Sequence, residues 1–296
     1  MIVNFTMKFY KYITVLIILN IIFPIGLKAL LVPQTAELIS LSSAGIAGDA
    51  NIEINPAAIV NKKSFISFSN NEWLGGLQGN KISYCKSSNK FNHYFSFEFL
   101  GIDDIELRDE QPSDAPIGYI ESNWIAFDYA GNIPNKFELD LGYKIKLNYS
   151  KLYTDRYYGY SFDFGLKKHI NKNLAIGFAI SDVGVEYKSN QSTAIDYSAG
   201  IGLAYNYSVE KKYFKGVDVF LDALAYESND LIRFGMKINF PYVSLMAGTS
   251  YSDGYGDLAY GLAFRYDSFE LIIGNLNHEN PILGSPVSLE FKYHIK

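Results

Sequence analysis

The chain has 296 residues, of which 48% are hydrophobic, 16% aromatic and 19% charged. Disordered chains carry more charge and fewer aromatic residues, so this composition excludes them. Helical membrane proteins contain several runs of about 20 apolar residues, whereas this sequence has one apolar run, near its beginning. With 26 Lys and Arg against 31 Asp and Glu, the chain is mildly acidic, which argues against nucleic acid as a partner because phosphate binding needs a basic surface.

Residues 1–29 have the pattern of a signal peptide. Two lysines precede an apolar run at 12–25, which is too short to span a bilayer and suits the hydrophobic part of a secretory signal. Ala29 provides a small residue for cleavage. We therefore expect a mature chain that begins near Leu30 and leaves the cytoplasm, with an uncleaved anchor as the alternative.

Residues 30–63 form a second region, which shows no strand alternation. Small residues there allow close backbone packing, and an Asn-Pro sequence initiates a turn. The region has few long side chains from which to build a core of its own, so we expect it to become ordered by packing against the rest of the chain. The residues that define it are Gly45, Gly48 and Asp49, followed by the turn residues Asn55, Pro56 and Ala57.

From residue 64 to residue 296, apolar and polar residues alternate with period two. In the clearest stretch, 137–150, every second residue is apolar, which places these side chains on one face of a strand. A strand of this length is long for a soluble sheet and ordinary for a tilted membrane strand. The pattern predicts fourteen strands, at 64–70, 78–86, 91–102, 119–130, 137–150, 157–168, 174–181, 194–208, 215–226, 230–240, 242–252, 257–266, 269–276 and 286–295.

An even number of strands is what closed antiparallel barrels of bacterial outer membranes require. The predicted connections on one side are short, such as 87–90 and 169–173, while the other side includes longer ones at 103–118 and 182–193. These features favour an all-β transmembrane antiparallel barrel of about 14 strands, with large apolar side chains facing lipid and small or polar ones filling the lumen. A soluble barrel, with the apolar face inward, is the alternative.

No group of residues predicts catalysis, cofactor binding or metal binding. The four histidines show no metal-ligand spacing, and nothing positions a serine for catalysis with His278. Cys85 is the only cysteine, which excludes an intramolecular disulfide. The acidic stretch 103–114 lacks the ligand spacing of an EF-hand, and a solvated loop explains it better than calcium bridging to lipid headgroups.

Several motifs in the first two thirds of the chain resemble one family. The small-residue stretch ending at Asp49, the Asn55-Pro56-Ala57 turn and the hairpins at 141–144 and 158–166 resemble FadL-type outer-membrane barrels, and more closely the PorV/PorQ family. In those barrels such an N-terminal segment packs inside the lumen. The resemblance therefore implies a plug at 30–63 inside a barrel at 64–296. The chain departs from the family at 51–54, where members usually carry an aromatic residue.

The resemblance also implies a location and a function. It implies an outer-membrane protein that contributes to protein export by type IX secretion, with lipid, secreted cargo or other secretion-system proteins as partners. The alternative is a FadL-like channel for a hydrophobic ligand, and the third hypothesis is a structural barrel without cargo. A channel should contain a large apolar luminal pocket, whereas a secretion partner should carry extended loops.

Overall fold

The computed structural model describes residues 32–49, 51–88, 90–108, 115–135, 137–189, 191–209, 211–226, 229–252, 255–279 and 284–295. The predicted signal peptide at 1–29 lies outside these residues and stays a prediction. Within the described part of the chain, the structure contains no helix that is both long enough and apolar enough to cross a membrane.

Residues 32–63 contain two short helices. Helix α2 (Ala36–Ser40) begins after Thr35, whose hydroxyl accepts a hydrogen bond from the amide of Leu38 at 3.3 Å. Helix η3 (Pro56–Asn61) is a 3₁₀ helix with Asn55 at its N-cap, and its first residue is proline, which is favoured there because its φ is already helical. The predicted Asn-Pro-Ala turn is therefore the start of a helical turn.

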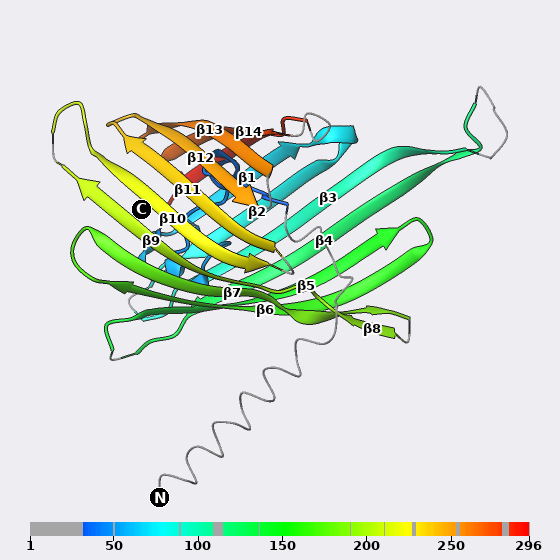
Figure 1. Cartoon of the computed structure of the whole chain (residues 1–296), viewed down its shortest axis with the longest axis horizontal. Helices are drawn as coiled ribbons and strands as arrows, with labels where there is room; N and C mark the ends of the chain where they lie inside the picture. The colour runs from blue at the N-terminus through cyan, green and yellow to red at the C-terminus, as the bar shows by residue number, and fades with distance from the viewer. Residues whose placement is uncertain are drawn as a thin grey trace, which may run out of the picture.

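The described residues also form one antiparallel sheet of fifteen strands. Strand β1 pairs with both β2 and β15, and β6 pairs with β7, so the sheet closes into a barrel (Figure 1). The strands are β1 (Phe65–Glu72), β2 (Gln78–Lys86), β3 (His93–Leu107), β4 (Gly118–Asn132), β5 (Asp140–Leu152), β6 (Asp155–His169), β7 (Leu174–Lys188), β8 (Gln191–Ala194), β9 (Ser198–Ser208), β10 (Gly216–Tyr226), β11 (Asn229–Asn239), β12 (Val243–Ser252), β13 (Tyr255–Tyr266), β14 (Phe269–His278) and β15 (Val287–His294).

Fourteen of these strands correspond to the predicted ones. Strand β5 begins at Asp140 and not at the predicted residue 137, while the larger differences lie at the other end of the barrel. Strand β3 continues to Leu107 and β7 to Lys188, so the predicted loops 103–118 and 182–193 are partly strand. The additional strand β8 pairs with the outer end of β7 and projects from the barrel (Figure 1). On the same side, Tyr153 and Thr154 alone join β5 to β6. The predicted sorting of long loops to this side is thus wrong in part, because longer strands take up much of that sequence.

The wall of the barrel is apolar outside and polar or small inside. On the outer face, Phe68, Ile82 and Phe97 are exposed, whereas Lys81 and Glu98 on the inner face are buried. The predicted alternation at 137–150 is present in β5, where buried and partly exposed residues alternate. This arrangement is the one expected for a barrel in lipid and the reverse of a soluble barrel.

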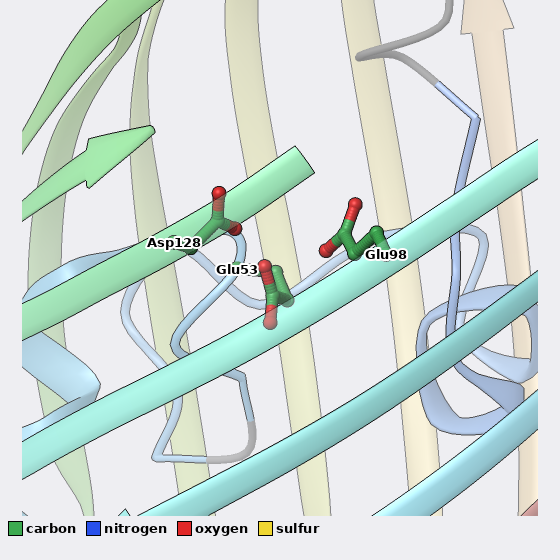
Figure 2. Close-up of side chains that lie close together, drawn as sticks. All are labelled: Glu53, Glu98 and Asp128. Carbon is green, nitrogen blue, oxygen red and sulfur yellow. The ribbon is translucent and has the colours of Figure 1, made fainter. Parts of the chain in front are cut away.

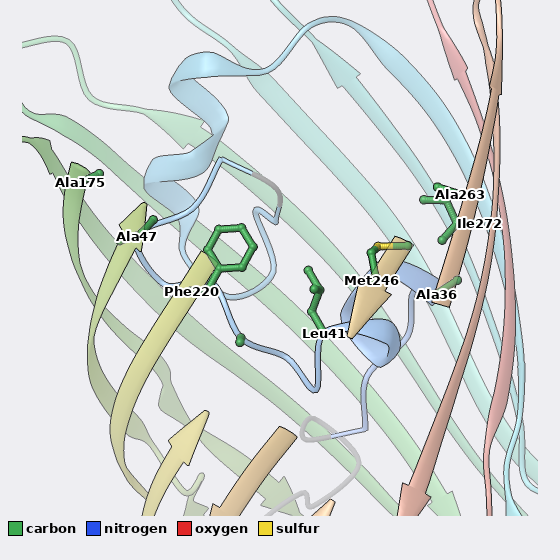
Figure 3. Packing of buried hydrophobic residues seen from close by; sticks show 10 residues of the cluster. Ala36, Leu41, Ala47, Ala175, Phe220, Met246, Ala263 and Ile272 are labelled. Carbon is green, nitrogen blue, oxygen red and sulfur yellow. The ribbon is translucent and has the colours of Figure 1, made fainter. Parts of the chain in front are cut away.

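The apolar core lies in the lumen, between the N-terminal segment and the wall. Leu41 and Ala47 of the segment lie among Phe220 of β10, Met246 of β12 and Ile272 of β14 (Figure 3). These side chains are almost completely buried. The segment therefore becomes ordered through contacts with the barrel, since it has no second layer of its own to pack against.

Candidate functional site

The N-terminal segment, defined here as residues 32–63, lies directly on glycines of the barrel wall. A side chain at Gly142 of β5 would place its Cβ 2.6 Å from the amide nitrogen of Ala57, and one at Gly177 of β7 would lie 2.6 Å from the carbonyl oxygen of Ile46. Glycine is needed at such positions because the two backbones approach too closely for any side chain. Most of these wall glycines are partners across neighbouring strands: Gly142 with Gly165, Gly177 with Gly202, Gly235 with Gly248, and Gly261 with Gly274.

Two polar side chains fix the backbone of the segment. Asp222 of β10 accepts hydrogen bonds from the amides of Gly45, at 2.6 Å, and Ile46, at 3.2 Å. Asn55 accepts a bond from the amide of Ala57 at 2.9 Å and donates one to the carbonyl of Ile46 at 2.7 Å. The structure thus brings the predicted residues Gly45, Asn55 and Ala57 together.

The other predicted plug residues also contact the wall. Gly48 lies against Phe220, since a Cβ at this glycine would lie 2.8 Å from the ring. Asp49 forms an ion pair with Lys167 of β6. Pro56 is almost completely buried at the start of η3. Gly48 and Pro56 thus take part in packing, whereas Asp49, whose side chain is about half exposed, contributes an ion pair.

Ion pairs between the segment and the wall were not predicted. The Glu37 carboxylate lies 2.6 Å from the ammonium of Lys237 and 3.5 Å from that of Lys292. The Glu53 carboxylate lies 2.6 Å from Lys81 and 3.4 Å from Lys144. Burial alone would raise the pKa of either glutamate, but the attraction of the two lysines outweighs it and holds the pKa of Glu37 and of Glu53 below the usual range.

The carboxylates of Glu53, Glu98 and Asp128 lie close together in the lumen. Glu98 of β3 and Asp128 of β4 point into the lumen, and their oxygen atoms lie within 4.8 Å of one another and of a Glu53 oxygen (Figure 2). Lys81 forms ion pairs with both Glu53 and Glu98. The sequence predicted no metal site, and no spacing in it joins these residues, because they come from three distant parts of the chain.

The segment leaves a cavity on each of its two sides. The first cavity has a volume of about 320 Å³, and Leu224 and Leu231 place it near the last residues of β10 and the first residues of β11. The second has a volume of about 500 Å³, and His169 and His294 place it near the opposite end of the barrel. Residues of the segment line both cavities, from Gln34 and Glu53 in the first to Glu37 and Lys62 in the second. The segment thus separates the two cavities.

Comparison with known proteins shows the fold of this chain. No family model and no curated protein matches it. Among solved structures, it is similar to the toluene transporter TbuX of Ralstonia pickettii, with a TM-score of 0.60 and 8% identity over 88% of this chain and 98% of that one. It is also similar to the toluene transporter TodX of Pseudomonas putida, with a TM-score of 0.58 and 10% identity over 88% of this chain and 97% of that one.

A FadL homologue of Pseudomonas aeruginosa gives a TM-score of 0.59 at 9% identity, over 90% of this chain and 99% of the homologue. The fold is that of FadL-type barrels. At these identities the likeness concerns the fold alone. The FadL-type part of the predicted resemblance is confirmed, whereas these structures do not show the PorV/PorQ family, and the protein-export function that it implies stays a prediction.

Proposed function

We propose that this protein is an outer-membrane channel for hydrophobic small molecules, placed in the membrane after removal of its signal peptide. The main support for this proposal is that the N-terminal segment divides the lumen and leaves a cavity on each of its two sides. The apolar outer face suits a lipid environment. The FadL-type fold, which includes two toluene transporters among the similar structures, supports the proposal by analogy.

The first cavity is the proposed ligand site. Its volume of about 320 Å³ lies within the range of small-molecule pockets. Leu38 of the segment and Trp124, Leu224 and Leu231 of the wall supply apolar lining. Eight charged side chains also line this cavity, and most of them form ion pairs with one another. The lining is therefore mixed, in contrast to the large apolar pocket that is expected of a channel from the sequence.

An irregularity in the wall lies beside this cavity. The register of β6 and β7 shifts between Phe162 and Phe164, and the pairing of β7 with β9 ends at Ser181. Asp182 lines the first cavity and adopts a positive φ of 66° there. Because the segment obstructs the straight path, we propose that ligand leaves the cavity at this irregularity or when the segment moves.

Uptake by cells that express the protein tests the channel. Leu224→Trp should fill part of the first cavity and reduce uptake of a small aromatic hydrocarbon relative to the native protein. Leu221→Trp is the matched control, because Leu221 lies on the outer face of the same strand and is exposed. Uptake no faster than in cells without the protein would overturn the proposal, and recovery of secreted proteins with the tagged barrel would then favour protein export.

A further inference from the structure

We propose that Glu53, Glu98 and Asp128 form a binding site for a hard divalent cation such as Ca²⁺ in the lumen. Carboxylate oxygens are the ligands that calcium prefers, and those of the three residues converge within 4.8 Å of one another (Figure 2). The site joins the N-terminal segment to β3 and β4. It does not depend on which molecules pass through the barrel.

The charged side chains around the three carboxylates favour the binding of a cation. The ion-pair network around the site, counted together with Asp128, comprises five carboxylates and three ammonium groups, and Arg233, which lines the same cavity, reduces the formal excess to one negative charge. Uncompensated charge away from water is costly, and a bound cation would offset this excess. The carboxylates are Glu53, Glu98, Asp128, Asp163 and Asp182, and the ammonium groups are Lys81, Lys144 and Lys146.

Asp128 provides a second, separate indication of a ligand. Its side chain is 2% exposed, and Ser96 donates a hydrogen bond to its Oδ2 at 3.2 Å. Its Oδ1 receives no hydrogen bond from any described residue. A buried carboxylate oxygen without a partner is rare, and a bound cation would satisfy it. Asp128 also lines the first cavity, which has room for the ion and for water ligands.

Lys81 is the internal competitor of this cation. Its ammonium lies 2.6 Å from Glu53 and also pairs with Glu98, so it draws on two of the three proposed ligands. Binding of a metal ion therefore requires these carboxylates to share their charge between the ion and Lys81, or Lys81 to move away. Replacing this lysine by an uncharged residue should accordingly strengthen binding of the cation.

Terbium luminescence with the full chain in detergent tests the site. Tb³⁺ replaces Ca²⁺ at oxygen sites, and Trp124, which lines the same cavity, should excite a bound ion. We expect Tb³⁺ emission that Ca²⁺ displaces. Asp128→Asn should weaken binding by about tenfold or more, whereas Glu121→Gln, an exposed residue of the same strand, should leave it unchanged.

A second measurement uses the variant Lys81→Met, so that the test does not depend on whether Asp128→Asn folds. This variant leaves Glu53 and Glu98 without their shared ammonium, so its melting temperature should rise on addition of Ca²⁺ more than that of the native protein. Absence of displaceable Tb³⁺ emission together with no calcium response of Lys81→Met would overturn the proposal.

Discussion

A single outward side chain of β5 tests which face of the wall meets lipid. Ile145 lies near the middle of this strand, on the face opposite the buried Lys144. Ile145→Arg should lower the free energy of unfolding by about 2–4 kcal/mol, because it places a charge at the bilayer centre. Leu141→Arg, near the end of the same face, should cost only about 0–1 kcal/mol. Equal costs, measured by urea unfolding in lipid vesicles, would contradict the assignment of the outer face.

The buried ion pairs of Glu37 allow a prediction about the stability of the folded protein. Glu37→Gln removes the carboxylate that pairs with Lys237 and Lys292, although Lys292 keeps Glu290 at 3.3 Å. Breaking a buried pair leaves a charge without compensation, so we expect a loss of about 3–5 kcal/mol in the free energy of unfolding. Glu106→Gln is the control, because its pair with Arg108 is exposed and should contribute about 1 kcal/mol or less.

The same ion pairs predict a dependence of stability on pH. The pKa values of Glu37 and Glu53 lie below the ordinary 4.5, so both glutamates stabilise the folded state fully above about pH 4.5. This stabilisation is lost as the pH falls further, through the lowered pKa values. The difference in melting temperature between the native protein and Glu37→Gln should therefore be constant from about pH 8 to 5 and shrink below about pH 4.5. A difference that does not shrink between about pH 4.5 and pH 2 would contradict this explanation.

At the scale of elements, the glycines of the wall explain how the N-terminal segment lies so close to it. Gly142→Ala would bring a Cβ to 2.6 Å from the amide nitrogen of Ala57, and this contact is with backbone, which cannot rotate away. We expect the segment to detach around η3, so that a protease cleaves it, while the barrel stays folded. Gly118→Ala is the control, since nothing lies within 4 Å of a Cβ there. Equal resistance to proteolysis would contradict this account.

The elements differ in how far the sequence predicts them. Fourteen strands follow from a local period-two pattern, which is why their positions agree broadly with the structure, although β3 and β7 run longer and β8 was not predicted. The ion pair of Glu37 with Lys292 joins residues 255 positions apart, so no local pattern reveals it. The sequence places Lys144 on the polar face of its strand but gives no sign of its partner Glu53. The wall glycines likewise indicate a small luminal side chain, while their contact with the segment becomes visible only in the folded barrel.

For the whole molecule, removal of the segment tests its role in closing the lumen. Deleting residues 32–58 leaves every strand intact, and Lys81, Lys144 and Lys292 keep ion pairs within the wall. We therefore expect a folded but less stable barrel, with a stable open conductance in planar bilayers where the native protein conducts little. A deleted protein that fails to fold would show that the segment belongs to the scaffold. One that folds and stays closed would show that luminal side chains block the path.

The pairing of β1 with β15 has a consequence for how the barrel is made. These two strands are separated by almost the whole barrel sequence, and their eight paired positions complete the ring. No intermediate that lacks β15 can satisfy the backbone of β1, and an open sheet edge is not tolerated in lipid. Assembly therefore has to wait for the last strand, and a chain cut short before Val287 would present two unpaired edges, at β1 and at β14, to its surroundings.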